Sequence, residues 1–132
     1  MFSPALSTAQ LATPAMPDPY GTSGTVSERA RAYLHTNCAN CHQPGGGTPT
    51  NLDLRYSTVL AATNACDAPP QAGELGLMTA RIVAPGAAAR SVLLARINQR
   101  DAQAMPPLAS TVVDAAGVNL LTSWVNSLTA CN

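Results

Sequence analysis

The stretch Cys38-Ala39-Asn40-Cys41-His42 decides the interpretation of this 132-residue chain. Upstream of it, Thr25 and Glu28 have the spacing of a capping box, with the threonine as N-cap and the glutamate at the third helical position. Apolar residues then recur at helical spacing on one face: Val26, Ala30, Tyr33 and Leu34. The sequence therefore predicts a helix that begins after Thr25 and runs into the Cys-His stretch, with residues 44–47, Pro-Gly-Gly-Gly, ending it.

The pattern C-x-x-C-H is the attachment pattern of haem c. Two thiols at this spacing reach the two vinyl groups on one side of a porphyrin, and the adjacent imidazole then points at the iron. We therefore expect Cys38 and Cys41 to hold one haem c covalently, with His42 as an axial iron ligand.

Two other kinds of site use paired cysteines. A thioredoxin-like redox pair requires a β-α-β setting, and no alternating strand pattern precedes Cys38. A zinc site requires further ligands in a compact pair, whereas Cys66 and Cys131 are far apart and the only other histidine is His35. Haem attachment is therefore the favoured interpretation.

A second axial ligand is expected across the haem from His42. Met105 is followed by two prolines, which exclude a regular helix and keep the loop over residues 103–108 extended. A stiff loop suits a thioether that must be held against iron, so Met105 is the predicted ligand. Most methionines fill cores instead, and the alternative ligands are Met78, Met16 and His35.

The rest of the chain predicts an all-α domain of short helices and long loops. Residues 1–24 are rich in Pro, Ser, Thr, Ala and Gly and are expected to form a linker or strap, followed by one domain over residues 25–132. Short helices are predicted near 58–63 and over 91–97. A last helix is predicted after Asp114, with an apolar face formed by Val118, Leu121, Trp124, Val125 and Leu128.

Taken together, these features resemble the class I c-type cytochromes over roughly residues 26–131. The resemblance implies a cytochrome c fold wrapped around one covalent haem. It also implies that the first and last helices cross with a small residue facing an aromatic one, for which Ala30 or Tyr33 against Trp124 would fit. Finally, it implies that the backbone carbonyl of Pro44 accepts the second ring N–H of His42 and orients the imidazole.

A narrower resemblance concerns Leu52-Asp53-Leu54-Arg55, the Pro85-Gly86 turn with residues 91–97, and Met105-Pro106-Pro107-Leu108. These segments are similar to cytochrome modules appended to bacterial periplasmic dehydrogenases, including pyrroloquinoline-quinone sugar dehydrogenases. The similarity implies a redox protein or a fused dehydrogenase domain as electron donor and a higher-potential protein as acceptor. It also implies a periplasmic location, although residues 1–28 contain no Arg or Lys and do not read as a signal peptide.

Two cysteines and several arginines remain to be placed. In an oxidising compartment Cys66 and Cys131 are expected to form a disulfide; the alternative is two free thiols, or thiols linked to other chains. Haem propionates require partners, and arginine binds carboxylates bidentately. The candidate arginines are Arg55, Arg81 and Arg96, with Tyr56 or Trp124 as alternative donors.

The predicted function is single-electron transfer rather than enzymatic turnover, because His42 and Met105 would fill both axial positions of the iron. The alternative is a five-coordinate haem with peroxidase or gas-binding activity. Nucleic acid is not an expected partner, since the net charge is zero and the seven arginines are dispersed. No run of about 18 apolar residues predicts a membrane span.

Overall fold

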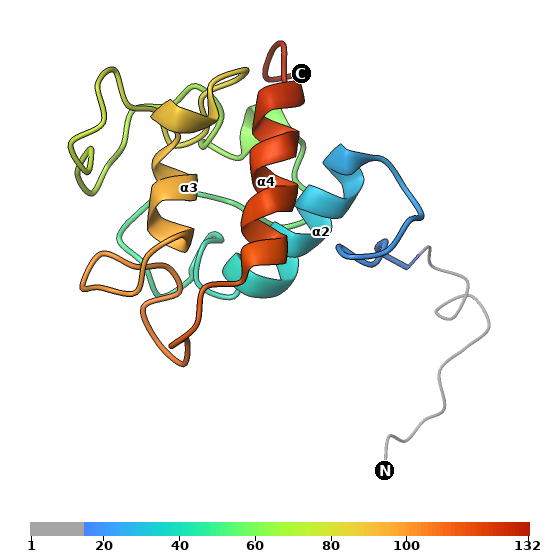
Figure 1. Ribbon diagram of the computed structural model, residues 1–132, viewed down its shortest axis with the longest axis horizontal. Helices are drawn as coiled ribbons and strands as arrows, with labels where there is room; N and C mark the ends of the chain where they lie inside the picture. Colours follow the sequence, from blue (N-terminus) through green and yellow to red (C-terminus); the bar gives the residue numbers. More distant parts are fainter. Residues whose placement is uncertain (1–14) are drawn as a thin grey trace.

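The computed structural model describes residues 15–132, and these residues form an all-α arrangement (Figure 1). The α-helices of this part of the chain are α2 (Val26–Cys38), α3 (Val92–Ile97) and α4 (Ala115–Ser127). Two 3-10 turns, η1 (Leu60–Ala62) and η2 (Ala88–Arg90), lie in the long connection between α2 and α3. The short helix expected near residues 58–63 is thus a single 3-10 turn, and η2 was not predicted.

Side-chain caps explain where the two long helices begin. The Thr25 hydroxyl accepts a hydrogen bond from the Glu28 N–H at 3.1 Å, and the Glu28 carboxylate accepts one from the Thr25 N–H at 2.7 Å. The predicted capping box is therefore confirmed. At α4, the Asp114 carboxylate accepts from the Gly117 N–H at 3.0 Å, as the predicted N-cap requires.

The first helix is shorter than the sequence predicted. It ends at Cys38, and the Ala39 N–H donates to the Leu34 carbonyl at 3.1 Å, which closes the helix end. Cys41 and His42 follow in a turn that is fixed by the His42 N–H donating to the Cys38 carbonyl at 2.9 Å. The Cys-His stretch thus begins on the last helical residue and continues outside the helix.

Helix α4 lies between α2 and α3 and packs against both (Figure 1). At the contact with α2, a Cβ atom added to Gly117 would lie 2.4 Å from a ring carbon of Tyr33. A small residue does face an aromatic one, but the glycine belongs to α4 and the tyrosine to α2. Trp124 is fully buried in the same core cluster as Ala30 and Tyr33, and the expected pairing of one of these residues with Trp124 stays a prediction.

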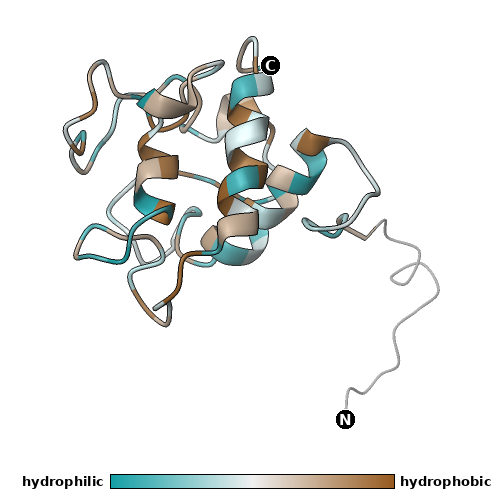
Figure 2. Ribbon diagram, in the orientation of Figure 1, coloured by the Kyte–Doolittle hydropathy of each residue, from teal (hydrophilic) through white to brown (hydrophobic). Residues whose placement is uncertain are grey.

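The core lies where the helices meet and contains few large side chains. Its largest fully buried apolar residues are Trp124, Leu34, Leu121, Val83 and Val125. Figure 2 shows hydrophobic positions interleaved with hydrophilic ones along α3 and α4, as in helices that bury one face. Among residues 15–132, no helix is both long enough and apolar enough to cross a membrane.

Part of the predicted N-terminal strap lies against the junction of α2 and α4. The Tyr20 ring meets the Tyr33 ring edge to face, with centroids 6.3 Å apart, and the Tyr20 hydroxyl donates to the Asp114 carboxylate. Arg29 donates to the Gly21 carbonyl at 2.9 Å. Partial burial and the neighbouring Asp114 raise the pKa of Tyr20 to about 12. Residues 1–14 lie outside the described part of the chain.

Cys66 and Cys131 lie at disulfide distance from one another, with Cα atoms 5.7 Å apart. The pair joins the middle loop to the segment that follows α4, across a sequence separation of 65 residues. A parallel β-bridge between Cys66 and Val83 places the same loop beside residues 81–84.

Candidate functional site

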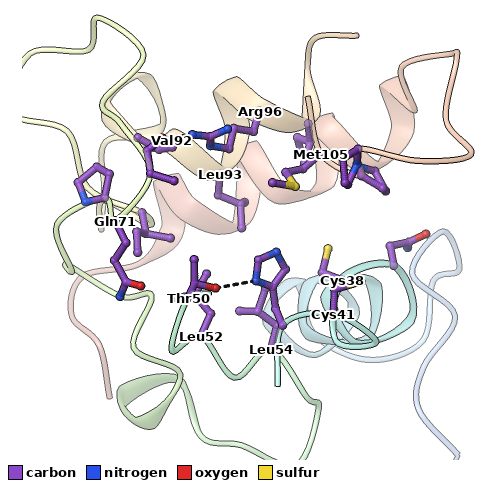
Figure 3. A pocket seen from close by; sticks show the side chains of 18 of the residues that line it. Cys38, Cys41, Thr50, Leu52, Leu54, Gln71, Val92, Leu93, Arg96 and Met105 are labelled. Atoms are coloured by element: carbon purple, nitrogen blue, oxygen red, sulfur yellow. Dashed lines mark hydrogen bonds between the residues drawn. The ribbon is translucent and has the colours of Figure 1, made fainter. Parts of the chain in front are cut away.

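An open cleft separates α3 from the end of α2 and the loop that follows it (Figure 3). One wall of the cleft carries Cys38, Cys41, Thr50, Leu52 and Leu54. His42 also lines the cleft and contacts Thr50 on this wall. The facing wall carries Val92, Leu93, Arg96 and Met105.

The structure brings together the four residues predicted to attach the haem and bind its iron. Cys38, Cys41, His42 and Met105 all line this one cleft. Figure 3 shows Met105 on the wall opposite Cys38, Cys41 and Thr50. The rival ligands lie elsewhere. Met78 is 86% exposed, neither it nor Met16 lines the cleft, and the His35 ring accepts a hydrogen bond from the Tyr56 N–H at 3.1 Å.

The backbone of His42 is held on both sides. Its N–H donates to the Cys38 carbonyl at 2.9 Å, and its carbonyl accepts from the Leu54 N–H at 2.9 Å. Its ring nitrogen Nδ1 lies 3.1 Å from the Thr50 hydroxyl oxygen. The imidazole is thus fixed by a hydrogen-bonded loop and not by the helix that precedes it.

Thr50 takes the place that the sequence assigned to the Pro44 carbonyl. The Gly46 N–H donates to the Gln43 carbonyl at 2.8 Å, which closes a tight turn around Pro44. In that turn a Cβ atom on Gly46 would lie 2.2 Å from the Cys41 carbonyl oxygen, so the chain passes closer to Cys41 than a larger residue allows. Pro44 does not line the cleft and His42 Nδ1 contacts Thr50 in this structure, while the expected bond to the Pro44 carbonyl stays a prediction.

The ionisation of the cleft residues also favours some chemistries over others. Burial raises the pKa of the Cys38 thiol to about 12, with a smaller contribution from Cys41. Reactive or zinc-binding cysteines are thiolates and commonly sit at a helix N-terminus or beside a cation. Cys38 instead ends α2, where the helix dipole disfavours an anion. Burial lowers the pKa of His42, which keeps the imidazole neutral and able to donate a lone pair to a metal.

The Met105 loop is tied to the end of α3 by backbone and arginine hydrogen bonds. The Met105 N–H donates to the Arg96 carbonyl at 3.0 Å. The Arg96 guanidinium donates to the Gln103 carbonyl at 2.9 Å and also to the Ala72 carbonyl. Arg100 donates to the Met105 carbonyl at 3.3 Å. These bonds fix the loop that places Met105 in the cleft.

The three predicted propionate arginines have separate environments. Arg96 lines the cleft, but its donors are used on loop carbonyls. Arg55 binds Asp53 bidentately at 2.9 and 2.7 Å and lowers the pKa of that carboxyl, while Arg81 pairs with Asp67 at 3.1 Å. Neither Arg55 nor Arg81 lines the cleft, because each is held by a nearer carboxylate of the protein itself.

The alternative donors are also placed away from the cleft. Trp124 is buried in the helical core and Tyr56 does not line the cleft. Sequence reasoning missed Thr50, Arg100 and the apolar pair Leu52 and Leu54. The residues Thr48-Pro49-Thr50 carried a usable signal, since they place two hydroxyls just after a glycine-rich turn that follows His42.

No family model, curated protein or solved structure matches this chain.

Proposed function

We propose that this chain has a cytochrome c fold and transfers single electrons through one haem c. Cys38 and Cys41 would attach the haem covalently, and His42 and Met105 would be the axial ligands of its iron. The single observation that carries the proposal is the cleft itself, with the C-x-x-C-H residues on one wall and Met105 on the other. A domain that binds no ligand would not need these residues to line one cleft.

The lining of the cleft fits a large, flat, mostly apolar group. The walls are formed largely by aliphatic side chains, among them Leu52, Leu54, Val92 and Leu93. Neutral imidazole nitrogen and thioether sulfur are a ligand pair that haem iron uses in electron-transfer proteins. The neutral, partly buried Cys38 thiol suits thioether formation better than a thiolate zinc site.

Bound in this cleft, haem would supply a one-electron iron couple whose potential is raised by His/Met ligation. The residues of the chain would then hold, orient and shield the group. His42 is fixed through Thr50 and two backbone hydrogen bonds, and Met105 is fixed through Arg96 and Arg100. With both axial positions filled, substrate has no access to the metal, so we infer a carrier and not an enzyme.

The proposal extends to partners and location. The electron donor would be a redox protein or a fused dehydrogenase domain, and the acceptor a protein of higher potential. Haem c attachment and the Cys66–Cys131 pair both fit a periplasmic or other extracytoplasmic setting. In such a setting residues 1–24 would serve as the connection to the donor.

The test is to express the chain together with a bacterial haem c maturation system. We expect the intact mass to rise by one haem, and the haem to stay with the chain after acid–organic extraction. Cys38→Ala with Cys41→Ala should abolish this attachment. The ferric protein should be low-spin with the weak far-red band of methionine ligation, and Met105→Ala should remove that band and lower the potential. A colourless wild-type protein would refute the proposal, while attached haem without the far-red band would indicate the five-coordinate peroxidase or gas-binding alternative.

A further inference from the structure

We propose that Thr50 is the positioning residue of the axial histidine, acting through a directed chain of hydroxyls that begins at His42 and ends on the Cys41 carbonyl. This inference rests on the proposed haem function. The resemblance to class I cytochromes assigns this role to the Pro44 carbonyl, so the two assignments make different predictions for the same ring nitrogen.

Three contacts form the chain. His42 Nδ1 lies 3.1 Å from Thr50 Oγ1. Thr50 Oγ1 lies 2.9 Å from Thr48 Oγ1. Thr48 Oγ1 donates to the Cys41 carbonyl oxygen at 3.4 Å. The chain therefore returns to the residue next to His42 and closes a ring around the glycine-rich turn.

The direction of every proton follows from the last contact. A carbonyl oxygen accepts and never donates, so the Thr48 hydroxyl proton points at Cys41. Thr48 must then accept from Thr50, because its own proton is used. Thr50 in turn must accept from His42, since its proton is used as well. In the opposite arrangement one of the three contacts would lack a hydrogen atom.

This direction fixes the tautomer of the imidazole. Nδ1 carries the proton and donates it to Thr50, so Nε2 keeps the lone pair that a metal ligand requires. Second ring N–H groups of metal-binding histidines commonly have such a partner, which sets both the ring orientation and the basicity of the ligand. The chain thus prepares His42 for iron using only residues of its own loop.

The loop geometry explains why hydroxyls take this role. Gly46 lies so near the Cys41 carbonyl that a Cβ atom would come within 2.2 Å of it, which lets the loop fold back within a few residues. Thr48 and Thr50 are then brought to the same side of His42. Thr50 lines the cleft, whereas Pro44 lies outside it.

The experiment compares the haem-loaded wild-type protein with Thr50→Val, Thr50→Ser and Thr48→Val. Valine keeps the shape of threonine without the hydroxyl, and serine keeps the hydroxyl. Loss of the acceptor weakens the imidazole as an electron donor to ferric iron, so Thr50→Val should raise the reduction potential. We expect the ratio of the affinities of the site for ferric and ferrous iron to change about tenfold, which is the lower end of the effects of outer-shell partners. For a one-electron couple this change corresponds to about 59 mV in the reduction potential.

The controls separate hydrogen bonding from packing. In Thr50→Ser the ratio of the affinities for ferric and ferrous iron should stay within about twofold of wild type. Thr48→Val should shift the reduction potential in the same direction as Thr50→Val but less, because Thr50 keeps its contact with His42. In the reduced wild-type protein, the Nδ1 proton of His42 should show a nuclear Overhauser contact with the Thr50 methyl group. That measurement needs no variant and holds even where Thr50→Val fails to fold.

Two results would overturn the inference while leaving the proposed function intact. One is a haem-loaded Thr50→Val protein with the potential of wild type. The other is an Nδ1 proton with no contact to Thr50, as expected if Pro44 were the acceptor. A wild-type chain that attaches no haem would instead refute the proposed function and this inference with it.

Discussion

Arg96 offers the sharpest test of how the Met105 loop is held. Arg96→Ala removes two hydrogen bonds from the guanidinium, one to the Gln103 carbonyl and one to the Ala72 carbonyl. The backbone bond from the Met105 N–H to the Arg96 carbonyl stays in place. The variant therefore frees the Met105 loop from the Arg96 guanidinium and leaves the Met105 side chain unchanged.

The magnitude follows from the bond that reaches the Met105 loop, which is the one to the Gln103 carbonyl. A hydrogen bond is worth roughly 1 kcal/mol net, and the partly exposed position of Arg96 argues against the larger values found for buried charged donors. Its loss should then cost the closed loop about 1 kcal/mol. Since about 1.4 kcal/mol is tenfold in an equilibrium constant, the open state of the loop should become about fivefold more populated.

The assay is displacement of Met105 from the ferric iron by added imidazole, followed through the loss of the far-red band. Because the added ligand binds when the loop is open, its apparent Kd should fall about fivefold in Arg96→Ala. Arg96→Lys keeps the charge and one donor group, so its imidazole Kd should lie between those of wild type and Arg96→Ala. Arg81→Ala is the matched control, since Arg81 pairs with Asp67 away from the cleft and should leave the Kd unchanged.

Two outcomes would refute this reasoning. An imidazole Kd within about twofold of wild type in Arg96→Ala would show that the guanidinium does not hold the loop. An unchanged Kd together with a shifted potential would show that Arg96 acts on the charge of the haem, as a propionate partner would.

Three further predictions concern stability and docking. Removing the disulfide by Cys66→Ser with Cys131→Ser should lower the free energy of unfolding by about 4 kcal/mol, from closure of a loop of 65 residues, measured by denaturant titration. The hydrogen bond from Tyr20 lowers the pKa of Asp114 in the folded protein. The ionised Asp114 therefore stabilises the fold above its unfolded pKa near 3.8, and this stabilisation is lost as the pH falls through the lower pKa of the folded state. Tyr20→Phe should therefore reduce the acid-induced loss of stability relative to wild type, and equal losses would contradict this. The rate of electron transfer with a soluble dehydrogenase should change less than tenfold between low salt and about 1 M salt, since the chain has no lysine to steer docking; a change of a hundredfold would show that charge does steer docking.

Local signals in the sequence predicted the helices well. Thr25 with Glu28, and Asp114 before α4, are signals whose partners lie within three residues, so no tertiary information is needed to use them. Met105 and His42 line the same cleft, which agrees with the prediction made from the two prolines that restrict the Met105 loop, and their role as iron ligands stays a prediction.

For the candidate propionate arginines, prediction is limited by competition between partners that only the folded chain brings together. Arg55 had a carboxylate two residues away in Asp53, and a fixed local partner is reached at less entropic cost than a distant one. Arg81 meets Asp67 only because a β-bridge places their loops side by side. The spacing of residues in the sequence does not tell whether such an arginine pairs with a carboxylate of the protein or with a haem propionate.

The role of Thr50 shows the same limit more closely. Pro44 and Thr50 both follow His42 within a few residues, and both offer an oxygen to the imidazole. The choice between them depends on how a run of three glycines turns, and glycine leaves the backbone the widest choice of conformations. In the folded chain His42 Nδ1 lies 3.1 Å from the Thr50 hydroxyl, and the close approach of Gly46 to the Cys41 carbonyl belongs to the turn between these two residues.

A general consequence concerns which residues control the proposed haem site. His42 and Met105 both lie outside helices, and each is held by hydrogen bonds from side chains that carry no iron ligand. Helical packing sets the distance between the walls of the cleft, while Thr50 and Arg96 set the orientation and the mobility of the ligands on those walls. Changes in the helical core should therefore alter stability first, whereas changes at Thr50 or Arg96 should alter potential or ligand exchange in a protein that remains folded. In the proposed electron carrier, this separation would let the fold stay constant while two polar contacts tune the metal.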